Sequence, residues 1–100
     1  MFRFVRTLTV REPGDLPAAV QFAAETTAYS NKNYAVNFKY GTESGGEQKV
    51  YWSMDFDSYA KLREYADKIT KDREYWALLQ KAKGVFVEGS MKDTFINFVD

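Results

Sequence analysis

A strand with two unlike faces, leading straight into a helix, is the feature that most constrains how this chain folds. The segment KVYWSMDF at 49–56 alternates as a β-strand does, and Asp57 or Ser58 then provides a helix cap. One face carries Val50, Trp52, Met54 and Phe56, and the other carries Tyr51, Ser53 and Asp55. The apolar face requires a core, so the segment predicts a sheet with helices packed on one side.

The composition limits both the size and the chemistry of the protein. The chain has 100 residues, which predicts one domain over 1–100, and its 14 basic and 14 acidic residues give a formal net charge of zero. This balance argues against a basic surface for nucleic acid or membrane. No cysteine or histidine is present, which excludes disulfides, thiolate sites and histidine-based catalysis or metal binding; only a carboxylate cation site stays open. We predict neither a metal nor a cofactor.

The N-terminal segment MFRFVRTLTVREPG has no continuous apolar stretch of the kind that a signal peptide needs. No window approaches the roughly 18 apolar residues of a membrane span. We therefore expect a cytoplasmic protein without membrane contact.

The order of predicted elements defines the fold class. Strands are expected at 2–10, 34–41, 49–56 and 85–89, with one helix from Asp15 and a second from Asp57 or Ser58. A restart at Thr70, with Asp72 and Glu74 in the next turn, predicts a short third helix that ends at Gly84. The segment 94–99 is either a continuation of the last strand or a separate fifth strand. This order is β-α-β-β-α-β, which predicts a ferredoxin-like α+β fold with an antiparallel sheet and all helices on one face.

The opposite face of this sheet is mixed in character, and three explanations for it stay open. It is an ordinary solvated surface, a platform for RNA, or the contact between two copies that pack sheet to sheet and close a barrel around a cavity. The RNA platform is the weakest of these because the face has few aromatic residues and no basic surround. The predicted members of this face are Val5, Thr7, Thr9, Ala35, Asn37, Lys39, Tyr51, Ser53, Asp55, Phe86 and Glu88.

Two carboxylates on this face are the candidates for proton transfer. In a closed and partly apolar barrel, burial would raise the pKa of Asp55 or Glu88 towards that of a general base. The alternative for Asp55 is an ion pair with Arg3 or Lys39, which we weight more strongly because structural ion pairs are common. The expected ligand contacts are Asn37, Tyr51, Ser53, Thr7 and Lys39 for polar groups, with Val5 and Phe86 as apolar walls.

Arg6 is an exception to the pattern, since it interrupts the apolar face of the first strand. Either a bulge shifts its register, or its side chain reaches past the edge of the helices. A role in binding an anion is the weaker interpretation.

The segment 54–82 carries a resemblance to a known group of proteins. The phrases DFDSYAKL and KDREYWALLQ occupy the places of a capped helix and a short following helix, and VEGSMKDTFINF is similar to the end of such chains. On these motifs and the element order, the sequence resembles the dimeric α+β barrel superfamily, which includes NIPSNAP-like proteins, haem-degrading enzymes and antibiotic-biosynthesis monooxygenases. The resemblance implies a homodimeric barrel.

The same resemblance limits which activity is expected. The haem-degrading branch uses a histidine as iron ligand, and this chain has none, so that activity is not predicted. The cofactor-independent monooxygenases use asparagine, tryptophan and tyrosine around a cavity. Asn37, Trp52 and Tyr51 are of these types, but Trp52 falls on the helix-covered face.

We therefore expect a homodimeric barrel protein that binds a small, largely apolar organic molecule in its cavity. Turnover without a cofactor, of the monooxygenase or proton-transfer kind, is left open, with Asp55 or Glu88 as proton acceptor. The alternative is a non-catalytic dimerisation module whose cavity is filled by its own side chains.

Overall fold

A four-stranded antiparallel sheet forms the base of the molecule, in a computed structural model that describes residues 1–99. The strands are β1 (Phe2–Thr9), β2 (Lys39–Glu43), β3 (Lys49–Phe56) and β4 (Lys92–Asn97). Their order is β2-β3-β1-β4, so that β1 and β3 lie at the centre and β2 and β4 at the edges. This is the predicted ferredoxin-like α+β arrangement, which the structure confirms.

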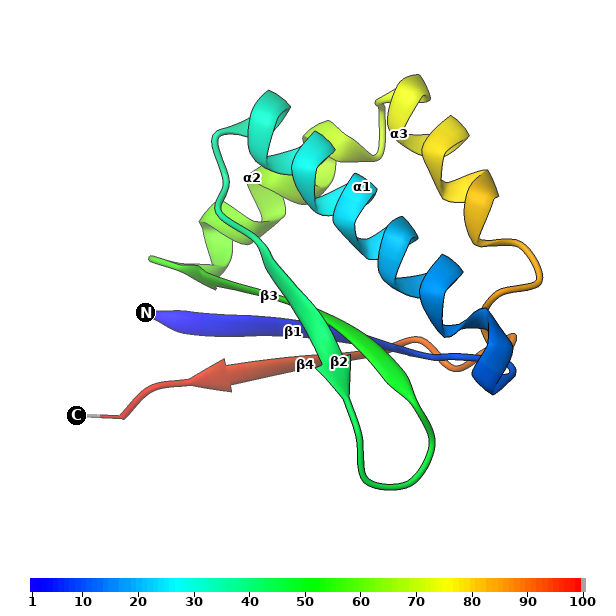
Figure 1. Cartoon of the computed structure of the whole chain (residues 1–100). Helices are drawn as coiled ribbons and strands as arrows, with labels where there is room; N and C mark the ends of the chain where they lie inside the picture. Colours follow the sequence, from blue (N-terminus) through cyan, green and yellow to red (C-terminus); the bar gives the residue numbers. More distant parts are fainter. Residues whose placement is uncertain (100) are drawn as a thin grey trace.

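Three α-helices lie on one side of the sheet (Figure 1). They are α1 (Leu16–Tyr34), α2 (Tyr59–Ile69) and α3 (Arg73–Leu79), with short 3-10 turns η1 (Pro13–Asp15) and η2 (Gln80–Ala82). None of the helices within residues 1–99 combines the length and the apolar character that crossing a membrane would need.

The core lies between these helices and the apolar faces of β1 and β3. Phe22 of α1 packs edge to face on Trp52, with ring centroids 6.1 Å apart, and the Trp52 indole N–H donates to Thr26 Oγ1 at 3.1 Å. The ring centroids of Phe56 and Tyr65 of α2 are 6.4 Å apart. Val50, Trp52 and Phe56 are buried, which confirms that this face of 49–56 is the core face.

Local capping explains where the second and third helices begin. The Ser58 hydroxyl accepts a hydrogen bond from the Lys61 amide at 3.3 Å, and the Asp72 carboxylate accepts from the amides of Glu74 and Tyr75. Both residues have extended backbone and satisfy amides that a helix leaves free at its first turn. The predicted start of the second helix is therefore confirmed, whereas the third helix starts from Asp72 because Thr70 still belongs to the end of α2.

The first helix is longer than predicted, and the strand expected at 34–41 is correspondingly shorter. Helix α1 continues to Tyr34, and β2 begins only at Lys39. Tertiary contacts hold the polar last turns in the helix. Ser30 is buried and accepts from the Tyr65 hydroxyl at 3.0 Å, and the Tyr34 hydroxyl donates to Asp72.

The last strand also differs from its predicted position. Within 85–89 only Phe86 forms a bridge, to Val10, and the regular strand β4 starts at Lys92. A turn separates the two, in which Gly89 has a φ of 77° and the Ser90 hydroxyl accepts from the Thr9 amide at 3.1 Å. Both pieces border β1, so the C-terminal segment continues along the same neighbour after an interruption.

Arg6 keeps a regular register, so the bulge considered for it is wrong. It stands directly opposite Asp93 of β4, and its guanidinium donates to both carboxylate oxygens, at 2.7 and 2.9 Å. This pairing raises the pKa of Arg6 above its usual value. The interruption in the apolar face is thus a cross-strand ion pair at the side of the core.

Candidate functional site

Six of the nine predicted site residues lie together on the uncovered face of the sheet. The register sets Val5 opposite Ser53, Thr7 opposite Tyr51, and Lys39 opposite Ser53 from the other side. Residues directly opposite each other in an antiparallel pair project to the same face, so these side chains and that of Asp55 share one surface. We call the four uncharged central residues the open-face patch: Val5, Thr7, Tyr51 and Ser53.

On the β2 side of the open-face patch, the position of Tyr51 depends on a glycine. The Tyr51 ring extends over Gly41, such that a Cβ at Gly41 would lie only 2.8 Å from the tyrosine hydroxyl and 2.9 Å from two ring carbons. Any side chain at position 41 would displace the ring. Gly41 therefore allows Tyr51 to lie across the sheet.

Asp55, the first candidate for proton transfer, forms the ion pair that was its structural alternative. The Arg3 guanidinium donates to both of its oxygens, at 2.7 and 3.1 Å, and the two residues stand opposite each other in the register. This contact holds the pKa of the Asp55 carboxyl below its usual value, despite an opposing effect of burial. A lowered pKa is the reverse of what a general base near neutral pH needs.

Three other predicted site residues do not join the patch. Phe86 lies on the helix-covered face, with its ring 5.7 Å from that of Phe22, because its bridge partner Val10 projects to that face. Glu88 lies in the exposed turn before β4 and is on no strand. Asn37 precedes β2, where its backbone amide donates to the Met54 sulfur at 3.1 Å.

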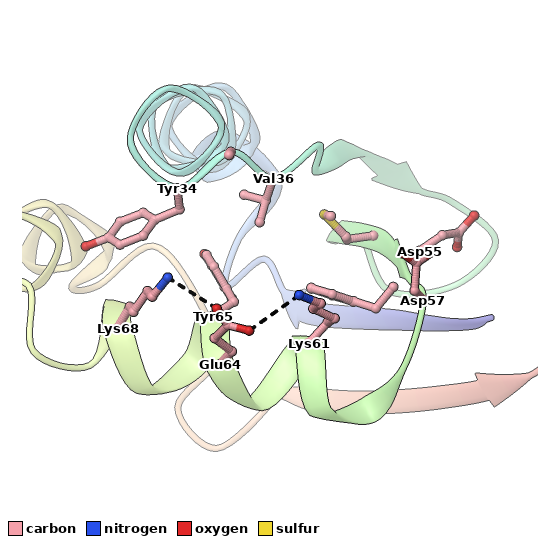
Figure 2. Close-up of a pocket in the computed structure, with 11 residues that line it drawn as sticks. Tyr34, Val36, Asp55, Asp57, Lys61, Glu64, Tyr65 and Lys68 are labelled. Atoms are coloured by element: carbon pink, nitrogen blue, oxygen red, sulfur yellow. Dashed lines mark hydrogen bonds and ion pairs between the residues drawn. The ribbon is translucent and has the colours of Figure 1, made fainter.

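Ala35, also expected on the open face, ends α1 with a left-handed φ of 50°. It lines a cavity on the helix side of the sheet, which the sequence did not predict. This cavity has a volume of about 390 Å³ and lies between α2 and the segment that joins α1 to β2 (Figure 2). Its walls come from Tyr34, Ala35, Val36, Met54, Asp55, Phe56, Asp57, Lys61, Glu64, Tyr65 and Lys68.

One sequence signal points to part of this cavity. Lys61, Tyr65 and Lys68 follow at spacings of four and three residues, which places them on one side of a helix. The opposite wall, residues 34–36, was expected in a strand, and so the pairing of the two walls was missed. Within residues 1–99, no three acidic side chains gather closely enough to hold a metal ion.

An acidic group joins the helices behind this cavity. One carboxylate oxygen of Asp72 accepts from the hydroxyls of Tyr29, at 2.6 Å, and Tyr34, at 2.5 Å. These donors lower the pKa of Asp72 below its usual value, and the contact raises the pKa of Tyr34 to about 12. The cluster fixes the end of α1 against the start of α3.

Comparison with known proteins shows a similarity in fold alone. No protein-family model matches the sequence, and no curated protein matches it. Solved structures are similar, however. The crystal structure of an uncharacterized NIPSNAP domain protein from Burkholderia xenovorans has a TM-score of 0.78 at 16% identity, over 99% of this chain and 95% of that one.

Two further structures agree with this result. The protein Atu4242 from Agrobacterium tumefaciens gives a TM-score of 0.77 at 17% identity, over 97% of this chain and 92% of that one. A proposed antibiotic biosynthesis monooxygenase from Deinococcus radiodurans gives 0.71 at 8% identity, over 100% of this chain and 94% of that one. The chain therefore shares the fold of NIPSNAP-family proteins and of an antibiotic-biosynthesis-monooxygenase-like protein, as the resemblance of its sequence predicted.

Proposed function

We propose that this chain forms a homodimer through the uncovered face of its sheet, and that the dimer binds a small, largely apolar organic molecule between the two sheets. The observation that carries the proposal is the open-face patch. Its four side chains are uncharged and only partly exposed, although no helix within residues 1–99 covers them. A solvated antiparallel sheet face normally carries long charged side chains at such central positions.

Exposed apolar side chains lie on the same face, on the edge strand β4 and just after it. Ile96 stands opposite Arg3 and so shares the open face, and it is 42% exposed. Phe98, 47% exposed, lies under the Arg3 guanidinium, which is 5.2 Å from its ring centre. Large exposed apolar side chains that adjoin one another are typical of a surface that binds a partner.

The charges on this face stand at its border. Arg3 and Asp55 neutralise each other at one end. Around the remaining margin lie Lys39, Lys92 and Lys49, with Glu43 directly opposite Lys49. A centre without charged residues and a charged rim agree with the composition of protein interfaces, whose core is depleted in charge. The small side chains of Val5, Thr7 and Ser53 would leave space between two sheets packed about 10 Å apart, which is where we propose that the ligand lies.

Binding is better supported than turnover in this proposal. The ion pair with Arg3 keeps Asp55 ionised and engaged, and Glu88 lies away from the patch. If the two sheets instead fill the space with their own side chains, the protein is a dimerisation module without a ligand.

The dimer is tested by replacing Thr7 with arginine and measuring mass by analytical ultracentrifugation. We expect a dimer for the unchanged chain at micromolar concentration and a monomer for Thr7→Arg, because the proposed interface would have to bury two arginines without partners. Thr42→Arg is the matched control: it lies in the same sheet, but it stands opposite Val50 and therefore projects to the other face. A monomeric unchanged chain would refute the proposal.

The ligand is tested separately by native mass spectrometry of the purified dimer. A bound small molecule that is lost in the Thr7→Arg variant supports the ligand. A dimer of the bare mass, whose stability does not change with a panel of apolar compounds, would leave the dimerisation module as the function.

A further inference from the structure

The cavity on the helix side has the features of a second binding site, formed within one chain. Figure 2 shows Tyr34 and Val36 along one side, α2 along the other, and Asp55 and Asp57 at one end. Its volume of about 390 Å³ falls in the range of sites for small molecules. All of its walls come from a single chain, so the site does not depend on dimerisation.

The inner walls of the cavity are apolar or aromatic. Val36, Met54 and Phe56 contribute apolar surface, and the rings of Tyr34 and Tyr65 meet edge to face at 5.8 Å. The hydroxyls of both tyrosines are already engaged, with Asp72 and Ser30 respectively. The two rings are therefore held in position and present carbon surface to the cavity.

The wall opposite α2 is also held in place. The Asn31 side chain accepts from the Phe38 amide at 2.8 Å and donates to the Phe38 carbonyl at 3.0 Å, which closes the segment that leaves α1. Within this segment Ala35 adopts the left-handed conformation, which is a common way for a helix to end and turns the chain away from α1.

The part of the rim that α2 provides carries two lysines and one glutamate, and Asp57 is the further carboxylate at the end of the cavity. Lys61 lies 3.8 Å and Lys68 3.5 Å from the carboxylate of Glu64, so that two ammonium groups share one carboxylate (Figure 2). At the far end, the charge of Asp55 is balanced by Arg3, and Asp57 lies away from Lys68. An anionic ligand group placed beside the lysines would complete the pairing of this rim.

From these features we infer that the cavity binds a small carboxylate with an aromatic or aliphatic body. The body packs between Val36 and the Tyr65 ring, and the carboxylate accepts hydrogen bonds from the ammonium groups of Lys61 and Lys68. This ligand class is distinct from the largely apolar molecule proposed for the space between the sheets.

The experiment is a titration of the full chain with phenylacetate and octanoate, followed by the backbone amide signals in ¹H–¹⁵N NMR. Phenylacetamide serves as the uncharged probe of matched shape. We expect saturable shifts at residues 34–36 and 61–68 with the carboxylates, and binding of phenylacetamide that is weaker by about tenfold, as loss of one charge-assisted contact implies. Equal binding of phenylacetamide would overturn the carboxylate specificity.

Variants at the rim sharpen this test without risk to the fold, because both lysines are exposed. The double variant Lys61→Gln with Lys68→Gln should weaken phenylacetate binding by about tenfold and leave phenylacetamide binding unchanged. Lys71→Gln with Lys83→Gln removes the same charge from exposed positions outside the cavity and should change neither.

The location of the shifts separates this site from the proposed dimer cavity. Shifts that persist in the monomeric Thr7→Arg variant support the helix-side site, even if the dimer proposal fails. Shifts confined to Val5, Thr7, Tyr51 and Ser53, or no saturable shift with either carboxylate at millimolar concentration, would refute it.

Discussion

The two faces of the central strands β1 and β3 are formed by alternating residues of the same segments, yet they differ in what their side chains contact. On the covered face, Trp52 is packed against Phe22 and donates its indole N–H to Thr26 of α1. On the open face, the neighbouring Tyr51 lies across Gly41 and meets no helix within residues 1–99. The covered face is complete within one chain, whereas the open face has apolar groups without a cover. We therefore expect the stability of the chain to depend mainly on the first face, and the proposed association to depend on the second.

The most severe way to test this comparison is to truncate adjacent residues of β3 on opposite faces. Trp52→Ala should lower the free energy of unfolding by about 3–5 kcal/mol, because it leaves a cavity in the core and removes the donor to Thr26. Tyr51→Ala should change the unfolding of the single chain by only about 0.5 kcal/mol and should weaken the proposed dimer instead. Urea unfolding at several protein concentrations distinguishes the two effects, since only a dimer gives a concentration-dependent midpoint.

If Trp52→Ala and Tyr51→Ala lower the free energy of unfolding equally at every protein concentration, the proposed difference between the two faces is contradicted. The open face would then contribute to the stability of the chain itself. Thr42→Arg, on the exposed margin of the covered side, is a suitable control for both variants.

A smaller effect is expected from the two arginines of β1, which form ion pairs on opposite faces. Arg6 and Asp93 retain 36% and 27% side-chain exposure, against 45% and 39% for Arg3 and Asp55. Arg6→Met should lower the free energy of unfolding by about 1–2 kcal/mol. This is less than for a fully buried ion pair, because both groups still reach water. Arg3→Met should cost clearly less, since exposed ion pairs contribute little.

A double-mutant cycle with Asp93→Asn measures the coupling on the covered side, with thermal unfolding as the readout. If Arg3→Met lowers the free energy of unfolding as much as Arg6→Met or more, the ion pair on the covered face is not the more stabilising of the two.

The smallest expected effect concerns two carboxylates whose pKa values are lowered by different causes. The charged guanidinium of Arg3 lowers the pKa of Asp55 on the open face, whereas the neutral hydroxyls of Tyr29 and Tyr34 lower that of Asp72 among the helices. Added salt screens exposed charges, so it should raise the pKa of Asp55 towards its usual value and leave that of Asp72 nearly unchanged. Carboxyl ¹³C shifts measured against pH at low and high salt provide the test.

Both groups affect stability in the same direction. A native pKa below the unfolded value stabilises the folded chain above the unfolded pKa, and this contribution is lost as the pH falls through the native value. Tyr34 has the opposite sign, because its native pKa of about 12 is raised: its contribution is present below the ordinary tyrosine pKa and disappears as the pH rises through about 12. A salt-sensitive Asp72 would indicate that a charge, rather than the two hydroxyls, lowers its pKa.

Much of the fold was predictable because the determining signals are local. Ser58 and Asp72 cap helices through bonds to residues two or three positions away, and the faces of 49–56 follow from strand alternation. The same alternation placed Val5, Thr7, Tyr51 and Ser53 on one surface once β1 and β3 were paired. The sequence also left the ion pair of Asp55 with Arg3 as an alternative, which is the arrangement observed.

The errors arose where a distant contact decided the outcome. The polar segment that ends α1 stays helical because Tyr34 and Ser30 bond to Asp72 and Tyr65, which are more than thirty residues away in the chain. Phe86 was assigned to the wrong face because its strand is reduced to one bridge. Neither contact has a signal in the neighbouring residues.

By itself, the sequence determined the order of the elements, the caps and the division of β1 and β3 into an apolar and a mixed face, since these depend on backbone periodicity and short-range hydrogen bonds. The tertiary structure alone decided the partner of Arg6, the end of α1 and the existence of the cavity between 34–36 and α2. The physical reason is separation: the walls of the cavity are brought together by packing of the whole chain, and no local preference encodes the space between them.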